Sequence, residues 1–162
     1  MSYTKIFKNE KFFIIILLLV SISLFIGFYF NEDSTGGAYL DYSVHSKISE
    51  NFSSDFKKTF LEYDKFNTRH TPIIPIFFSI FKSFEINDNL IRFLNLSIPF
   101  LIIFFFYQSL TLSNNKINKK TVLLISFLII LSPTIRSLSI WPDSHLFGLL
   151  FFIMSLFLFI KF

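Results

Sequence analysis

The hydrophobic residues of this chain fall into long runs separated by polar segments. The first run, residues 12–30, holds 19 uncharged residues. A helix of that length is about 28 Å long, which matches the hydrocarbon core of a bilayer. Similar runs follow at about 90–112, 121–138 and 144–160. The pattern therefore predicts an all-α membrane protein with about four transmembrane helices.

Lysines flank these runs unevenly and predict an orientation. They precede the first run, separate the second from the third, and follow the fourth: Lys5, Lys8, Lys11, Lys116, Lys119, Lys120 and Lys161. Short cytoplasmic flanks carry an excess of lysine and arginine. We therefore expect a multi-pass protein of the cell's inner (cytoplasmic) membrane, with a cytoplasmic N-terminus and with residues 31–89 outside.

A shorter apolar run at 72–84 interrupts this outer segment. It has only 13 residues, including two prolines and Lys82. A run this short rarely spans a bilayer. If it did span, the lysine-rich segment 113–120 would lie outside, against the charge rule. The interpretation is an amphipathic helix that lies in the membrane interface.

The rest of the outer segment has helical periodicity. After the Gly36-Gly37 break, a helix is predicted over 38–52, because apolar residues recur every fourth position at Leu40, Val44, Ile48 and Phe52. Asp41 and His45 are also four residues apart, so they share the neighbouring face. A second amphipathic turn is predicted from the helical spacing of Phe56, Phe60 and Tyr63.

The sequence "RHTP" precedes the interfacial run and indicates a helix start. Thr71 is the expected cap, with Pro72 in the first turn. Arg69 and His70 then stand at a helix N-terminus, where an anion is bound favourably.

Composition agrees with a membrane protein and excludes several other classes. Of the 162 residues, 52% are hydrophobic, and 26 are phenylalanine. The absence of cysteine excludes disulfides and thiolate chemistry. Three histidines make a zinc site an unfavoured interpretation, although carboxylates could add ligands. We therefore expect no cofactor, with a divalent metal ion as an open alternative that the sequence does not support. The net charge of +4 forms no basic stripe, so nucleic acid is not an expected partner.

The order of segments resembles a known family. An outer acid follows the first span in "LDYSVH"; a basic residue and "TPIIP" precede the interfacial run; "LIRFLNL" opens the next span; and a span with "LSP" leads to a short outer turn, "WPDSH". This order is similar to the N-terminal part of the integral-membrane glycosyltransferases with the GT-C fold, especially the dolichyl-phosphate-mannose protein mannosyltransferases and the lipid A aminoarabinose transferases. Members of that group are several times longer, so residues 1–162 are expected to be one transmembrane domain, a truncated N-terminal part.

The resemblance implies an activity and a set of site residues. The family transfers a sugar from a polyprenyl-phosphate carrier to an acceptor at the outer face, here a glycan, lipid or protein acceptor that the sequence does not identify. Asp41 matches the family's first outer acid and is the candidate general base. Tyr42 stands where a second acid is usual. The implied substrate-binding residues are His45, Arg69, His70, Arg136 and Asp143.

Simpler interpretations accompany each of these assignments. Asp41 also suits the dipole at a helix start, and Asp143 suits a helix cap. His45 is equally interpretable as an exposed polar residue. Arg69 and His70 would serve as cations that bind lipid head groups, and Arg136 as a cation that extends to the interface. The alternative function is a multi-pass assembly or anchoring protein without catalysis, in which Asp41, Arg69 and Asp143 would lie far apart.

Overall fold

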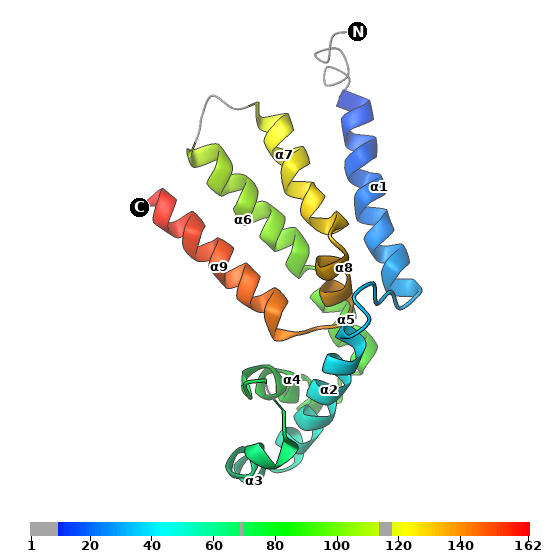
Figure 1. Cartoon of the computed structure of the whole chain (residues 1–162), viewed down its shortest axis with the longest axis vertical. Helices are drawn as coiled ribbons and strands as arrows, with labels where there is room; N and C mark the ends of the chain where they lie inside the picture. The colour runs from blue at the N-terminus through cyan, green and yellow to red at the C-terminus, as the bar shows by residue number, and fades with distance from the viewer. Residues whose placement is uncertain (1–9, 69, 114–117) are drawn as a thin grey trace.

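A computed structural model describes residues 10–68, 70–113 and 118–162 (Figure 1), and these ranges contain helices and no strands. The prediction of an all-α fold is therefore confirmed for the described part of the chain. In chain order the elements are α1 (Glu10–Tyr29), α2 (Ala38–Ser54), α3 (Phe56–Leu61), the 3₁₀ helix η2 (Tyr63–Phe66), α4 (Ile73–Ser83), α5 (Asp88–Asn95), α6 (Ile98–Ser113), α7 (Lys119–Phe127), the 3₁₀ helix η3 (Leu128–Leu131), α8 (Pro133–Ile140) and α9 (Ser144–Lys161).

Two helical segments are long and apolar enough to cross a membrane. They are Asp88–Ser113, which joins α5 and α6, and Ser144–Lys161. A third candidate exists if Lys119–Leu131 and Pro133–Ile140 count as one bent span. The described apolar part of α1, Ile14–Tyr29, is shorter than a full span. The prediction of four spans is thus supported only in the coarser form of a membrane protein with two or three candidate spans.

The third predicted span is not one continuous helix, because Pro133 breaks it. The two halves are bent by 68° relative to each other. Ser132, the residue before the proline, has an extended backbone, as expected from the clash between a proline ring and a preceding helical residue. Pro133 then occupies the first turn of α8, where its missing N–H costs nothing.

The helices form two layers (Figure 1). Helices α1, α6, α7 and α9 form a fan, in which α6 lies between α7 and α9, while α2, α3 and α4 form a separate group beyond one end of the fan. The short helices α5 and α8 lie where the two layers meet. The first turns of α1 and α7 and the last turns of α6 and α9 gather at the far end of the fan, away from residues 31–89.

A buried arginine of α5 holds the junction together. The guanidinium of Arg92 lies 3.6 Å from the ring centroid of Trp141, and its Nε donates a hydrogen bond to the carbonyl of Ile140. From the same helix, Asn95 donates to the carbonyls of Leu138 and Ser139. The last carbonyls of a helix have no partner within the helix, so these side chains from α5 satisfy the end of α8.

Arg136 of α8 forms the second polar link between helices. Its guanidinium donates to both carboxylate oxygens of Glu32 and to the hydroxyl and carbonyl of Ser23 on α1. A Cβ added at Gly27 would clash with Oε2 of Glu32, so a larger residue there would displace the end of this side chain and disturb the pair.

We expect this ion pair to make stability pH-dependent. The hydrogen bond from Arg136 lowers the pKa of Glu32 below its ordinary value of 4.5, despite the opposing effect of burial. A carboxylate with a lowered folded-state pKa stabilises the protein above its ordinary pKa, and this contribution is lost as the pH falls through the folded-state value. On acidification from about pH 6 to about pH 3.5, the melting temperature of the parent should therefore fall by about 2–4 °C more than that of Glu32→Gln.

Thermal unfolding in detergent over this pH range measures the effect. Glu85→Gln is the matched control, because Glu85 is exposed on the same side of the membrane domain, and it should keep the parent slope. If the melting temperature of Glu32→Gln falls with pH as steeply as that of the parent, a stabilising role for the pair is contradicted.

Candidate functional site

Helix α2 carries two of the predicted site residues. The helix prediction over 38–52 is confirmed, because α2 runs from Ala38 to Ser54. The carboxylate of Asp33 accepts hydrogen bonds from the backbone N–H groups of Ala38 and Tyr39 and so caps the first turn. The chain folds back to this position through Gly36, whose positive φ of 72° suits glycine.

The packed face of α2 differs from the predicted apolar ridge. Ile48 and Phe52 are buried as expected, but Leu40 and Val44 are 62% and 41% exposed. The buried face instead includes Tyr42 and His45, which point toward α4 and the end of α8. His45 has no exposed surface, so its interpretation as an exposed polar residue is wrong.

His70 approaches this face from the segment before α4. The hydroxyl of Tyr63 donates to the His70 carbonyl, and the His70 N–H donates to the hydroxyl of Thr68. The expected cap at Thr71 is wrong, because α4 begins at Ile73 with Pro72 at the N-cap position and no side-chain cap. Arg69 lies outside the described residues, so its role stays a prediction.

Asp143 enters from the opposite side, in the turn between α8 and α9. Its position follows from the Arg92–Trp141 junction, which fixes the end of α8 two residues earlier. Its carboxylate accepts hydrogen bonds from the N–H and hydroxyl of Ser144, so Asp143 caps α9 as one interpretation of the sequence expected. Asp143 is 1% exposed.

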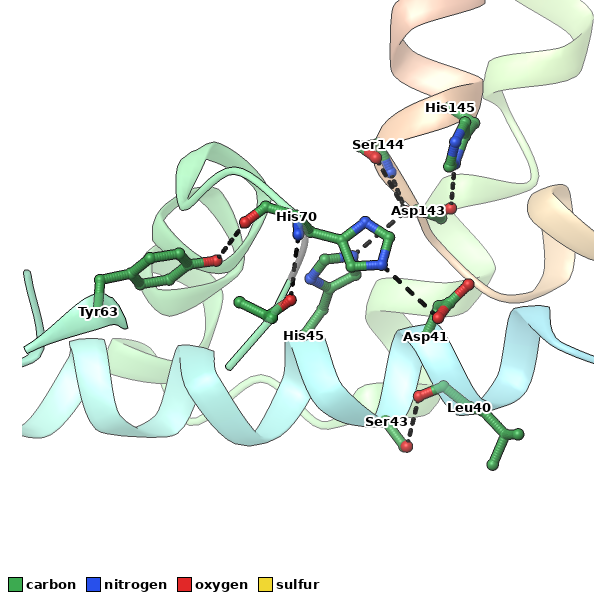
Figure 2. A network of polar contacts seen from close by, with 10 residues as sticks. Leu40, Asp41, Ser43, His45, Tyr63, His70, Asp143, Ser144 and His145 are labelled. Atoms are coloured by element: carbon green, nitrogen blue, oxygen red, sulfur yellow. Dashed lines mark hydrogen bonds and ion pairs between the residues drawn. The ribbon is translucent and has the colours of Figure 1, made fainter. Parts of the chain in front are cut away.

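These segments bring five titratable residues together, which we call the histidine–aspartate cluster (Figure 2): Asp41, His45, His70, Asp143 and His145. Nε2 of His45 lies 3.2 Å from Oδ1 of Asp143, and Nδ1 of His145 lies 2.5 Å from Oδ2 of the same carboxylate. Nε2 of His70 lies 3.6 Å from Oδ1 of Asp41. The ring centroids of His45 and His70 are 4.8 Å apart.

The surroundings of Asp143 favour its charged form. Burial by itself would raise the pKa of this carboxyl group. Hydrogen bonds with His45, His145 and the Ser144 N–H outweigh burial and hold the pKa well below its usual range. The second ring nitrogen of His45, Nδ1, has no hydrogen-bond partner within the described structure, and such a buried unsatisfied group costs about 1–3 kcal/mol.

The cluster lies beside two cavities of different character. A polar cavity of about 480 Å³ is lined by Asp41, His70, Thr71, Ser144 and His145. An apolar cavity of about 200 Å³ lies between α4, α5, the start of α6 and α9, with Phe77, Phe78, Phe81 and Phe147 among its lining residues. Both cavities have lining residues on α9, because His145 lines the polar cavity and Phe147 lines the apolar one, about 3 Å apart along the helix axis.

The structure thus gathers four of the six predicted site residues: Asp41, His45, His70 and Asp143. It leaves Arg136 apart, in its ion pair with Glu32. Sequence reasoning missed His145, although the spacing in "DSH" places its imidazole within reach of Asp143. A metal ion also has possible ligands here, because donor atoms of His45, His70 and Asp143 all lie within 4.8 Å of one another.

Comparisons with known proteins gave no match for this chain. No family model, no curated protein and no solved structure matches the chain.

We expect Asp143 to be the residue of the cluster on which stability depends most. Asp143→Asn removes the charge, and an amide cannot offer two acceptor oxygens to His45 and His145. Weakening or removing the acceptor of the buried His45 should lower the free energy of unfolding by about 1–3 kcal/mol. Thermal or denaturant unfolding in detergent measures this change.

Asp64→Asn is the matched control, because Asp64 is an exposed aspartate of the same segment, residues 31–89. Substitutions at such surface positions usually change stability by less than about 0.5 kcal/mol. Equal stability of the two variants would contradict the role given to Asp143.

Proposed function

We propose that this chain transfers a sugar from a polyprenyl-phosphate carrier to an acceptor hydroxyl at the outer face of a membrane, as its resemblance to the GT-C glycosyltransferases implies. The observation that carries the proposal is the convergence of Asp41, His45, His70 and Asp143 from three separate segments at one end of an apolar helix bundle. A non-catalytic anchoring protein has no need to place Asp41 and Asp143 around one site.

Asp41 is the proposed general base. Its side chain is 34% exposed and lines the polar cavity, so an acceptor hydroxyl can reach it. In the reaction, the acceptor oxygen bonds to the anomeric carbon, the bond from that carbon to the carrier phosphate breaks, and the acceptor proton passes to Asp41. Polyprenyl phosphate leaves with the bonding electrons, and the anomeric configuration is inverted.

The carrier phosphate needs hydrogen-bond donors or positive charge as it leaves. His70 and His145 line the polar cavity and are the proposed donors, together with Arg69 as predicted from the sequence. Arg136 has no such role in this proposal, because its charge is neutralised by Glu32. The adjoining apolar cavity, with Phe77 and Phe147 in contact at 5.8 Å between ring centroids, is the proposed site of the first isoprene units.

The activity test uses the full chain in lipid nanodiscs that contain synthetic undecaprenyl-phosphate sugars, a panel of hexoses and pentoses. Release of undecaprenyl phosphate in the presence of a mixed acceptor extract is followed by mass spectrometry. Loss of a general base typically slows a reaction by about 10²–10⁴-fold, so Asp41→Asn should release the carrier that much more slowly than the parent.

Asp64→Asn serves as the control and should match the parent rate. A parent chain that releases no more carrier than empty nanodiscs contradicts the proposed function and favours the anchoring alternative. Equal rates for Asp41→Asn and the parent contradict the base assignment alone.

The proposed membrane is the cell's inner membrane, with the N-terminus cytoplasmic and residues 31–89 outside. Lysines at the helix ends that gather away from residues 31–89 support this orientation: Lys11, Lys119, Lys120 and Lys161. The histidine–aspartate cluster then faces the outer side.

Because the chain has no cysteine, single cysteines report this orientation without background. We expect Asp64→Cys in intact spheroplasts to react with a membrane-impermeant maleimide. Lys161→Cys should react only after the membrane is permeabilised. The reverse pattern would contradict the orientation and place the cluster in the cytoplasm.

A further inference from the structure

We propose that His45, His70 and Asp143 bind one divalent transition-metal ion, with Zn²⁺ as the best match. Each residue offers one donor atom, and no two of these atoms are more than 4.8 Å apart. The residues come from three segments of the chain, so their convergence is a product of the fold and not of sequence spacing. Their surroundings provide four further observations that point to a cation.

The first observation is the separation of two donors. Nε2 of His45 and Oδ1 of Asp143 are 3.2 Å apart. A tetrahedral Zn²⁺ with ligand bonds of about 2.0–2.1 Å holds its donors about 3.4 Å from one another. A charge-assisted hydrogen bond between the same atoms would measure about 2.7–2.9 Å. The observed distance is at the long end of the range for a hydrogen bond and also fits two ligands of one metal ion.

The second observation concerns the groups that orient the ligands. Metal-binding histidines usually direct their other ring nitrogen to a carboxylate or carbonyl, and ligating carboxylates are themselves hydrogen-bonded. Nε2 of His70 faces Asp41 at 3.6 Å, which leaves Nδ1 of His70 for the ion; Figure 2 shows this nitrogen on the side of Asp143. Oδ2 of Asp143 is held by His145, while Oδ1 faces His45 and also accepts hydrogen bonds from the N–H and hydroxyl of Ser144, which orient the carboxylate.

The third observation is burial. The side chains of His45 and Asp143 are 0% and 2% exposed, so both would bind in a dry setting in which attraction between a cation and a carboxylate is strong. Nδ1 of His45 has no hydrogen-bond partner within the described structure. This nitrogen lacks the orienting partner that His70 has, so burial holds the His45 ring with Nε2 toward Asp143.

The fourth observation is an accessible side. His70 is 13% exposed and lines the polar cavity, together with Ser144 and His145. An ion with three protein ligands keeps a position for water or another oxygen donor. Here that position lies on the cavity side. If the proposed function holds, a phosphate oxygen of the carrier can occupy it, and the ion then takes the place of the direct hydrogen bond proposed for His70. Metal binding itself does not depend on that function.

The donor set decides the class of metal. Imidazole nitrogens suit zinc and other first-row transition metals, whereas Mg²⁺ and Ca²⁺ prefer sites made of oxygen donors alone. Two histidines and one carboxylate therefore select Zn²⁺, Co²⁺ or Fe²⁺ over the alkaline-earth ions. Drawing the donors from at most 4.8 Å to about 3.4 Å requires a shift of about 1.4 Å or less, which the half-buried His70 can supply next to the cavity.

The experiment measures metal binding on the full chain, without substrate. The chain is purified in detergent through a tag that contains no histidine and is then treated with a chelator. Co²⁺ is added as a spectroscopic probe and then displaced with Zn²⁺, and elemental analysis after gel filtration gives the stoichiometry. We expect one ion per chain and visible absorption of the intensity that four-coordinate Co²⁺ produces.

Four variants test the assignment of the ligands. His70→Asn and Asp143→Asn should bind Zn²⁺ at least about 100-fold more weakly than the parent. His145→Gln removes only an orienting contact and should bind about 10-fold more weakly, at the lower end of the effect of such partners. Asp64→Asn, the exposed control, should bind like the parent.

Circular dichroism and gel filtration identify variants that remain folded, and His70→Asn is the decisive one because His70 is the least buried of the three proposed ligands. Parent-like binding by folded His70→Asn would overturn the proposal. A larger loss in His145→Gln than in His70→Asn would also overturn it, because it would indicate an ion held at the exposed His145. Absence of bound metal in the parent would overturn the proposal and leave the proposed function standing.

Discussion

A buried guanidinium governs how the two layers of this molecule join. Arg92 stacks on Trp141 and donates to the carbonyl of Ile140, at the point where α8 ends inside the protein. Carbonyl groups at a helix end require donors, and an apolar environment supplies none. Asp143 follows Trp141 by two residues. Its position over α2, and with it the whole histidine–aspartate cluster, therefore depends on the contacts that Arg92 makes.

The same requirement explains which charged groups are free for chemistry. Arg136 is committed to Glu32, and Arg92 is committed to the helix end and the aromatic rings around it. Both cations serve to connect helices. The groups that border the polar cavity are instead imidazoles and one partly exposed carboxylate, Asp41. Such groups change protonation or bind ions readily. The charged residues that connect the helices are therefore different from the titratable residues that border the cavity.

The sequence predicted local features well and long-range ones poorly. Helix α2 and the shared face of Asp41 and His45 follow from spacing along one helix. The 98-residue separation of His45 and Asp143 carries no such signal, so their contact required the structure. The apolar run 121–138 predicts one span and misses the break at Pro133, although a proline inside a helical run is itself a signal for such a break. The pairing of Arg136 with Glu32 has no such signal, because it depends on the room that Gly27 leaves against α1.

The long separation between the members of the cluster also affects how the protein is made. At synthesis rates of about 5–20 residues per second, the 98 residues between His45 and Asp143 take about 5–20 s to emerge. During that interval His45 lacks its partner Asp143, because the turn that carries Asp143 has not yet been synthesised. The cluster is therefore completed only when the ribosome reaches the start of α9. A nascent chain that stalls before that point leaves the imidazole of His45 without its partner.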